Sequence, residues 1–333
     1  MRILLMGDVM LGRLVNQALK TRDAGYVWGD TLPLLSAADL RACNLECVLS
    51  SRGRPWSVPP KVFHFRSDAK NVAVLSTAGI DIVSLANNHV LDYEYEALLD
   101  MLEILERSGI NYCGAGRNRE EARRPARVER QGIRVAMVAA TDNEPGWEAA
   151  PGRPGTFYVP TGLRDRRVTE LQQAVSRLAQ DSGFVIVSLH WGPNWGYEPP
   201  QEHVELGRAL IEAGADAVFG HSPHVFRGIE FYRRKPILYS AGDFIDDYAV
   251  DEVERNDESF VFAIEAQAHE VGEISLYPTV ISRFQARRAD PRTAAAIAAK
   301  MQALCEKLGT RSWWSAGEQS LFVAAPGPAS RAA

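Results

Sequence analysis

Short runs of apolar residues alternate along this chain with longer segments in which apolar residues recur at helical spacing. A strand that is covered on both faces reads as a continuous apolar run, so the short runs predict buried strands. These predicted strands are Arg2–Met6, Leu40–Asn44, Ile80–Leu85, Val135–Ala139, Phe184–Leu189, Ala217–Phe219 and Ile237–Tyr239. The longer segments predict helices at Asp68–Ala78, Tyr93–Ser108, Leu163–Gln180, Gln201–Ala213 and Pro291–Lys307. Such an alternation is typical of an α/β fold.

The pattern changes after about Tyr248. Later segments alternate apolar and polar residues, which predicts antiparallel strands at Phe260–Glu265, Glu273–Leu276 and Thr279–Phe284. The sheets are therefore expected to be mixed. No Ser/Gly/Pro-rich linker divides the chain, so we expect one domain over residues 1–324. The small and polar residues from Ala325 to Ala333 predict a flexible tail.

Composition narrows the class of protein. The chain has 333 residues, of which 46% are hydrophobic and 24% charged, as in a globular protein with a large core. The net charge is -5 and no long basic run is present, so nucleic acid is not an expected partner. No apolar run reaches the roughly 18 residues of a membrane helix, and Gly7 ends the first run too early for a signal peptide. We therefore expect a cytoplasmic protein without a membrane span; its oligomeric state stays open.

Polar side chains gather where the predicted strands end. Parallel strands place their carboxyl ends at one edge of a sheet, so these side chains are expected to meet there. Buried imidazoles and carboxylates are unfavourable unless they are paired or bind a metal. Imidazole, carboxylate and amide donors suit Mn, Zn or Fe, so we expect one or two divalent ions. The candidate ligands are Asp8, Glu46, Asn88, His190, His221 and His224, with His89 beside them.

Some cysteines and histidines are not expected to bind the metal. Cys43 and Cys47 form no CxxC pair and are expected to be buried apolar residues. His203 and His269 are expected at the surface, and His64 on the face of a strand.

The polar clusters belong to longer motifs: GDVMLGR (Gly7–Arg13), NLE (Asn44–Glu46), SLANNHVLDY (Ser84–Tyr93), SLHWG (Ser188–Gly192), GADAVFGHSPHV (Gly214–Val225) and KPILYSAGDF (Lys235–Phe244). Together these motifs resemble the CapA family of poly-γ-glutamate capsule synthesis proteins, within the calcineurin-like metallophosphoesterase superfamily. The resemblance spans roughly residues 2 to 248. It implies a four-layer α/β/β/α sandwich with mixed sheets and a dinuclear metal centre.

The resemblance also implies roles for the candidate residues. Asp8 and His224 would hold a first metal, and Glu46 would bridge to a second metal held by Asn88, His190 and His221. His89 would be the catalytic acid, and Asp92 would fix its tautomer. Met10 stands where the superfamily usually has a histidine ligand, and Asp243 stands where many relatives have asparagine. We expect that Asp243 replaces some of the lost negative charge.

Further residues are candidates for substrate binding. Arg13 follows the Asp8 turn, and its guanidinium fork suits a carboxylate or a phosphate. Lys61 is a second anion-binding candidate, and the aromatic residues Trp191, Trp195 and Tyr197 are candidates for a pocket wall. The full set is Arg13, Asn44, Lys61, Trp191, Asn194 and Asp243.

Three functions remain open from the sequence. The first is hydrolysis of a phosphoester of a small anionic substrate by metal-activated water, with His89, Asp92 and Arg13 as catalytic residues. The second is a hydrolase or transferase that acts on γ-glutamyl amides, with the γ-glutamyl polymer as partner. The third is a non-catalytic accessory role in capsule polymer synthesis.

Overall fold

The computed structural model describes residues 1–325, and its main feature is a pair of stacked β-sheets. The first sheet has the strand order β19-β20-β17-β16-β1-β2-β5-β6, and β15 and β18 pair with β1 and β17. Its strands are β1 (Arg2–Val9), β2 (Leu40–Leu45), β5 (Ile82–Ser84), β6 (Asn111–Cys113), β15 (Asp243–Ile245), β16 (Glu258–Gln267), β17 (Glu270–Ser282), β18 (Gln285–Arg288), β19 (Arg311–Ser315) and β20 (Ser320–Ala324).

The second sheet has the order β13-β14-β12-β11-β9-β8. Its strands are β8 (Ala126–Arg130), β9 (Ile133–Thr141), β11 (Phe184–His190), β12 (Ala217–His221), β13 (Ile229–Tyr232) and β14 (Lys235–Leu238). Two short pairs lie outside the main sheets: β3 (Val48–Leu49) with β4 (Arg66–Ser67), and β7 (Ala115–Gly116) with β10 (Gly155–Thr156). Both main sheets combine parallel and antiparallel pairs, which confirms the expected mixed sheets.

The helices are α1 (Arg13–Ala18), α2 (Leu32–Ser36), α3 (Val72–Thr77), α4 (Glu94–Arg107), α5 (Arg119–Ala122), α6 (Arg166–Asp181), α7 (Gln201–Glu212) and α8 (Pro291–Lys307). Helices α3 and α4 cover the outer face of the first sheet, and α6 and α7 cover that of the second. Short 3-10 helices span Tyr26–Thr31, Ala69–Asn71 and Pro145–Trp147. None of the helices in the described part of the chain has both the length and the apolar character needed to cross a bilayer.

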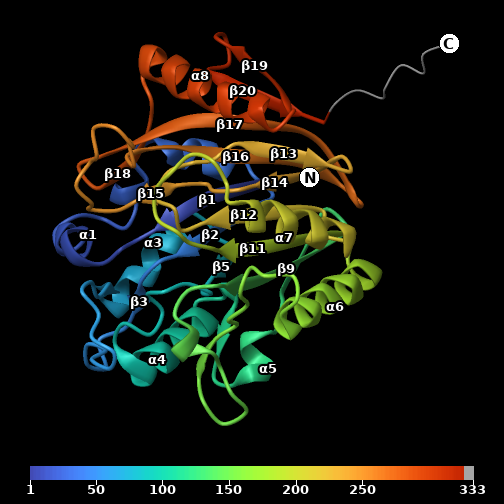
Figure 1. The fold of residues 1–333 in the computed structure, drawn as a ribbon. Helices are drawn as coiled ribbons and strands as arrows, with labels where there is room; N and C mark the ends of the chain where they lie inside the picture. The colour runs from blue at the N-terminus through green and yellow to red at the C-terminus, as the bar shows by residue number, and fades with distance from the viewer. Residues whose placement is uncertain (326–333) are drawn as a thin grey trace.

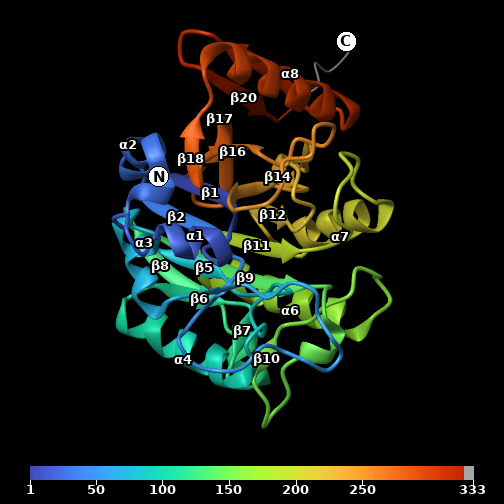
Figure 2. The ribbon, with the colours of Figure 1, turned by 90° about the vertical axis from the view of Figure 1, so that its left-hand side faces the viewer.

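The core shows how the layers are built. Successive side chains of a strand point to opposite faces, so Leu4 of β1 joins a cluster with α3 and α4, while Ile3 joins a cluster between the sheets. Val187 of β11 packs on its outer side with α6 and α7. The order is therefore helices, sheet, sheet, helices, as expected for an α/β/β/α sandwich (Figures 1 and 2). Helix α8 packs against β17 and β19 at one end of the molecule.

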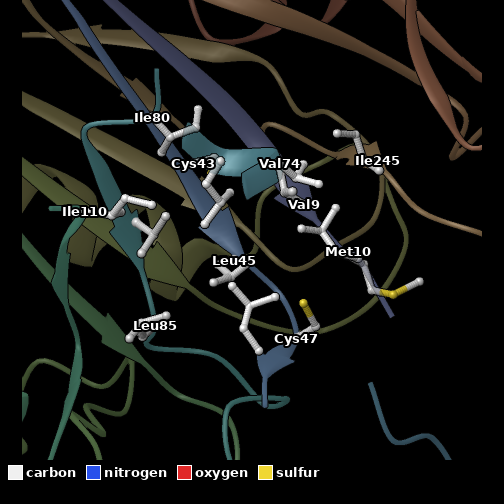
Figure 3. Packing of buried hydrophobic residues seen from close by; sticks show 14 of the residues in the cluster. Val9, Met10, Cys43, Leu45, Cys47, Val74, Ile80, Leu85, Ile110 and Ile245 are labelled. Carbon is white, nitrogen blue, oxygen red and sulfur yellow. The ribbon is translucent and has the colours of Figure 1, made fainter. Parts of the chain in front are cut away.

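Cys43, in β2, and Cys47, which follows it, belong to this core. Cys43 and Cys47 are fully buried and free, as expected for apolar residues, and Figure 3 shows them among aliphatic side chains such as Leu45. Burial of apolar side chains such as these is the main favourable contribution to folding.

The predicted elements match the structure in kind, and most differ from it by a few residues at their ends. Two differ in how they are divided. The helix predicted at Asp68–Ala78 divides into a 3-10 turn and α3. The strands predicted at Glu273–Leu276 and Thr279–Phe284 form one long strand, β17, because Tyr277 and Pro278 continue its pairing with β16. The tail predicted from Ala325 lies, after its first residue, outside the described residues.

Two histidine predictions were wrong. His203 is 3% exposed and stacks on Trp191 at 4.5 Å, because it falls on the same buried face of α7 as Leu206 and Leu210. His64 lies in the irregular segment between β3 and β4, where its Nε2 is 2.8 Å from the carbonyl oxygen of Trp56. His269 is exposed, as predicted.

Candidate metal centre

The carboxyl ends of strands from both sheets meet at one place. In the first sheet, Asp8 of β1 is in register with Asn44 of β2 and with Asp243 of β15. In the second sheet, His190 of β11 is in register with His221 of β12. Parallel pairing therefore brings residues that are far apart in the sequence into adjacent positions.

A glycine makes the approach of β1 and β15 possible. A Cβ atom on Gly7 would lie 1.8 Å from the carbonyl oxygen of Gly242, which is far inside van der Waals contact. The backbone amide of Asp8 donates to that same oxygen at 3.0 Å. The close approach that glycine permits thus fixes Asp8 next to Asp243.

The first candidate ligand group is rich in carboxylates. It contains Asp8, Glu46, His224 and Asp243, whose ligand atoms all lie within 4.8 Å of one another. The three acids are at most 1% exposed, and the Nδ1 atom of His224 is 3.0 Å from Oδ1 of Asp243. One oxygen on each of Glu46 and Asp243 is buried without a hydrogen-bond partner. These orphaned oxygens are what a bound cation would satisfy.

The second candidate group is richer in nitrogen. It contains Asp8, His190 and His221. The Nδ1 atoms of the two histidines are 2.9 Å apart, and Nδ1 of His221 is 3.7 Å from Oδ1 of Asp8. Ser188 contacts the other nitrogen of His221, Nε2, at 2.8 Å, which leaves Nδ1 free to face the group. Asn88 adjoins this group, with its Oδ1 atom 3.0 Å from Nε2 of His190.

Asp8 belongs to both groups, whereas Glu46 belongs to one. The resemblance had implied that Glu46 occupies the bridging position. Because Asp8 contributes an oxygen to both groups, it is a second candidate for that position, beside Glu46.

Burial perturbs every ionisable member of these groups. Burial raises the pKa of Asp8 to about 6 and raises the pKa values of Glu46 and Asp243 well above their usual range. For the last two, the charge of Asp8 adds to the increase. Burial lowers the pKa of His221 to about 3 and that of His190 well below its usual value. A cluster that is unfavourable for bare carboxylates and holds neutral imidazoles fits a divalent cation.

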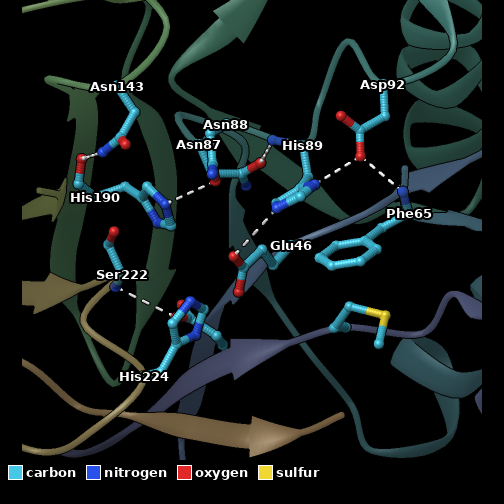
Figure 4. A network of polar contacts seen from close by, with 12 residues as sticks. Glu46, Phe65, Asn87, Asn88, His89, Asp92, Asn143, His190, Ser222 and His224 are labelled. Carbon is cyan, nitrogen blue, oxygen red and sulfur yellow. Dashed lines mark hydrogen bonds and ion pairs between the residues drawn. The ribbon is translucent and has the colours of Figure 1, made fainter. Parts of the chain in front are cut away.

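His89 lies beside the carboxylate group. Its Nδ1 atom is 2.6 Å from Oδ2 of Asp92, and its Nε2 atom is 3.8 Å from Oε1 of Glu46 (Figure 4). Its ring stacks on Phe65 with the centroids 3.9 Å apart. Burial lowers the pKa of His89 to about 4, although the Asp92 carboxylate opposes that change. Asp92 is held in turn by Lys61, whose Nζ atom is 2.6 Å away.

Two asparagines support this arrangement from behind. Asn44 is fully buried and donates from Nδ2 to Asp8 at 2.7 Å, so it orients a candidate ligand and lies away from any surface that a substrate could reach. Asn87 donates to Asn44 at 3.0 Å and accepts from the amide of His89. Sequence reasoning missed Asn87, although it precedes Asn88 in the same polar cluster; Ser188 and Asp246 were missed too.

A pocket of about 570 Å³ opens over the cluster. Of the residues expected to bind substrate or to form the pocket wall, four line it: Arg13, Lys61, Asn194 and Trp195. Asn88, His89 and His224 form part of the same lining, together with the aromatic residues Phe63, Phe65, Trp195 and Tyr248.

Other residues expected to bind substrate lie elsewhere. Trp191 is 1% exposed and donates from Nε1 to the carbonyl oxygen of Tyr239. Side chains alternate along an extended segment, so Trp191 points away from the cluster into which His190 points. Tyr197 also lies outside the lining and bonds to the carbonyl oxygen of Glu254. Asp243 is fully buried within the ligand group rather than in the pocket wall.

The fold and the cluster define the class: a mixed α/β protein of the metallophosphoesterase-like type with a candidate metal site between its sheets. Residues 2–248 match the model of the family described as "Bacterial capsule synthesis protein PGA_cap", and the chain belongs to that family.

Similar proteins carry related names. A "probable polyglutamine synthesis accessory protein" of Mycobacterium tuberculosis is 36% identical over 284 residues, which cover 74% of each chain. The "capsule biosynthesis protein CapA" of Bacillus anthracis is 28% identical over 245 residues, covering 73% of this chain and 59% of the relative. A solved structure of a hypothetical protein from Thermus thermophilus covers 84% of this chain and 98% of that chain, with a TM-score of 0.49 and 17% identity.

Proposed function

We propose that this protein is a metal-dependent hydrolase that cleaves a phosphoester of a small anionic substrate. The observation that carries the proposal is that Asp8 belongs to two adjoining ligand groups, and that His224 of the first group lines a pocket. The buried His89–Asp92 pair stands at the side of the same pocket. A bound divalent cation supplies an activated water and stabilises developing negative charge in sites of this kind.

Other residues would transfer a proton or orient the ligands. Asp92 engages Nδ1 of His89, so Nε2 is the atom that would exchange a proton with the substrate oxygen. Lys61 neutralises Asp92 and holds it in place. Ser188 and Asn44 would keep His221 and Asp8 oriented toward the ion.

The two ligand groups suit different ions. Three carboxylates and one imidazole favour a harder ion such as Mn²⁺, whereas two imidazoles with one shared carboxylate favour Zn²⁺ or Fe²⁺. Asp243 would supply the donor that is missing at Met10, whose sulfur instead accepts the amide of Gly12 at 3.0 Å. Asp246, which is 4% exposed and has an unpartnered carboxylate oxygen, would support Asp243 from behind.

A second candidate is an accessory role in polymer synthesis, or action on γ-glutamyl amides. The observation that favours it is the naming of the relatives as capsule biosynthesis and polyglutamine synthesis accessory proteins. Under this proposal the cluster would bind metal, but metal-loaded protein would not hydrolyse phosphoesters.

Hydrolysis assays test the choice. Protein loaded with Mn²⁺ is expected to cleave p-nitrophenyl phosphate or bis-p-nitrophenyl phosphate and to release no glutamate from poly-γ-glutamate. His89→Gln should lower kcat by about 10²–10⁴-fold while the metal content is kept. The matched control His269→Gln, at an exposed histidine outside the pocket, should keep the wild-type rate. Inactivity of the loaded protein on both phosphoesters would reject the proposal.

A further inference from the structure

The mouth of the pocket exposes apolar side chains to solvent. Val62 is 85% exposed, Phe63 is 57% exposed and Trp195 is 40% exposed, and all three line the pocket. They come from two separate segments, one between β3 and β4 and the other between β11 and α7. Isolated apolar residues on a surface need no explanation, but a group of them around one pocket marks a binding site.

These apolar side chains flank the candidate centre on two sides. The ring of Phe63 is 6.4 Å from that of Phe65, which stacks on His89. The ring of Trp195 is 5.8 Å from that of His224, a candidate ligand. A group attached to a substrate at the cluster would therefore leave the pocket between Phe63 and Trp195.

Trp195 is held firmly in this position. Its backbone amide donates to the carbonyl oxygen of Pro223 at 2.9 Å, next to His224. Its own carbonyl oxygen accepts from the buried guanidinium of Arg227 at 2.9 Å. These bonds hold the backbone at Trp195, so less conformational entropy is lost there when a ligand packs against the exposed ring.

The cationic side chains of the pocket provide one anchor for an anion. Lys61 is already paired with Asp92 at 2.6 Å. Arg13 contacts Asp247 through Nε at 3.3 Å, and within residues 1–325 no hydrogen bond engages its two terminal amino groups. Its guanidinium carbon lies within 5.9 Å of the ring centroids of Phe63, Phe65 and Tyr248. One oriented fork amid aromatic rings suits a single anionic group.

We propose that the substrate is an amphiphile with one anionic head and an apolar or aromatic group. The inference rests on the proposed function. The head, a phosphate or a carboxylate, binds at the ligand cluster and Arg13, and the apolar group packs between Phe63 and Trp195. A polyanionic chain would instead require a row of unpaired cations along the mouth, where the structure has Val62, Phe63 and Trp195.

Alkylphosphonates test the proposal because their P–C bond is not hydrolysed. Binding of methyl-, propyl- and butylphosphonate to the metal-loaded full chain is measured by calorimetry. Affinity is expected to rise about tenfold from methyl- to butylphosphonate, since partial burial of each methylene gives about a twofold gain. Arg13→Gln should weaken all three by a similar factor. The double variant Phe63→Ser/Trp195→Ser should bind all three phosphonates with similar affinity.

The matched control is Val253→Ser, which alters a valine that is 82% exposed but lies outside the pocket lining. It should keep the wild-type dependence on chain length. Equal affinity for all three phosphonates would contradict the proposal of an amphiphilic substrate but would leave the proposed function intact. Affinity for γ-glutamyl oligomers that rises with each added residue would overturn it as well. If no phosphonate binds to the loaded protein, the proposed function fails together with this inference.

Discussion

His203 illustrates how one buried titratable side chain links sequence, packing and acid stability. Its ring stacks on Trp191, which directly follows the candidate ligand His190, and its Nδ1 atom has no hydrogen-bond partner. Burial lowers the pKa of His203 to about 4, so the folded protein keeps it neutral where an unfolded chain would be protonated. Between pH 6.5 and 4 the unfolded state therefore binds the extra proton, and stability falls as pH falls.

His203→Phe should reduce this loss. The variant keeps an aromatic ring against Trp191 and removes the titration, so it should lose roughly 2 kcal/mol less stability than the wild type between pH 7.5 and pH 5. Urea unfolding at the two pH values measures the difference. Any effect of the substitution on packing is the same at both pH values, so it cancels when the two stabilities are compared. An unchanged loss in the variant would show that His203 is not a source of acid sensitivity.

Ser188 gives a second test on a single side chain. Its hydroxyl contacts Nε2 of His221 at 2.8 Å and leaves Nδ1 directed at Asp8 and His190. Ser188→Ala should lower metal affinity by about 10–100-fold, because the orientation and tautomer of His221 are no longer fixed. Competition with a chelating dye measures this. Ser176→Ala, at an exposed serine of α6, serves as the control and should bind metal like the wild type.

The pairing of β1 with β15 is the element that joins two acids of the site. It depends on Gly7, because any side chain there would strike the backbone of Gly242. Gly7→Ala should destabilise the protein by about 3 kcal/mol or more and lower its metal content. Gly146→Ala is the control, since a Cβ atom at Gly146 meets nothing within 4 Å. Equal denaturation midpoints for the two variants would contradict the role given to Gly7.

Strands, helices and their mixed arrangement could be predicted from the sequence because burial imposes periodicity. The polar residues at strand ends could be predicted for the same reason, as for Asp8, His190 and His221. The direction in which a side chain points beyond a strand end could not be predicted from the sequence. Both Trp191 and Asn44 were expected to bind substrate, but Trp191 points away from the pocket and Asn44 supports Asp8. The length of β17 could not be predicted either, because it depends on pairing with β16.

The arrangement of the whole molecule places the candidate centre at the seam between its two sheets. The first sheet carries Asp8 and Asp243, while the second carries His190 and His221. Neither sheet alone presents a complete ligand group, so the inter-sheet core sets the spacing of the centre. Bound metal should therefore stabilise the folded chain by mass action.

Removal of metal should lower the melting temperature measurably. With free ion at about 100 times its Kd, binding contributes about 2.7 kcal/mol to the free energy of unfolding, which chelation removes. Differential scanning calorimetry with and without a chelator measures this. Glu230→Gln, at a buried acid outside both ligand groups, should show the same chelator effect as the wild type. A melting temperature that does not respond to a chelator would count against a resident ion.

Metal content of the purified chain and its variants, determined by elemental analysis, tests the central claim most directly. The wild type is expected to bind two divalent ions. Asp8→Asn should lose both because Asp8 belongs to both ligand groups, whereas Asp243→Asn should lose one. A wild type that holds no divalent ion, or an Asp8→Asn variant that holds as much as the wild type, would contradict the account.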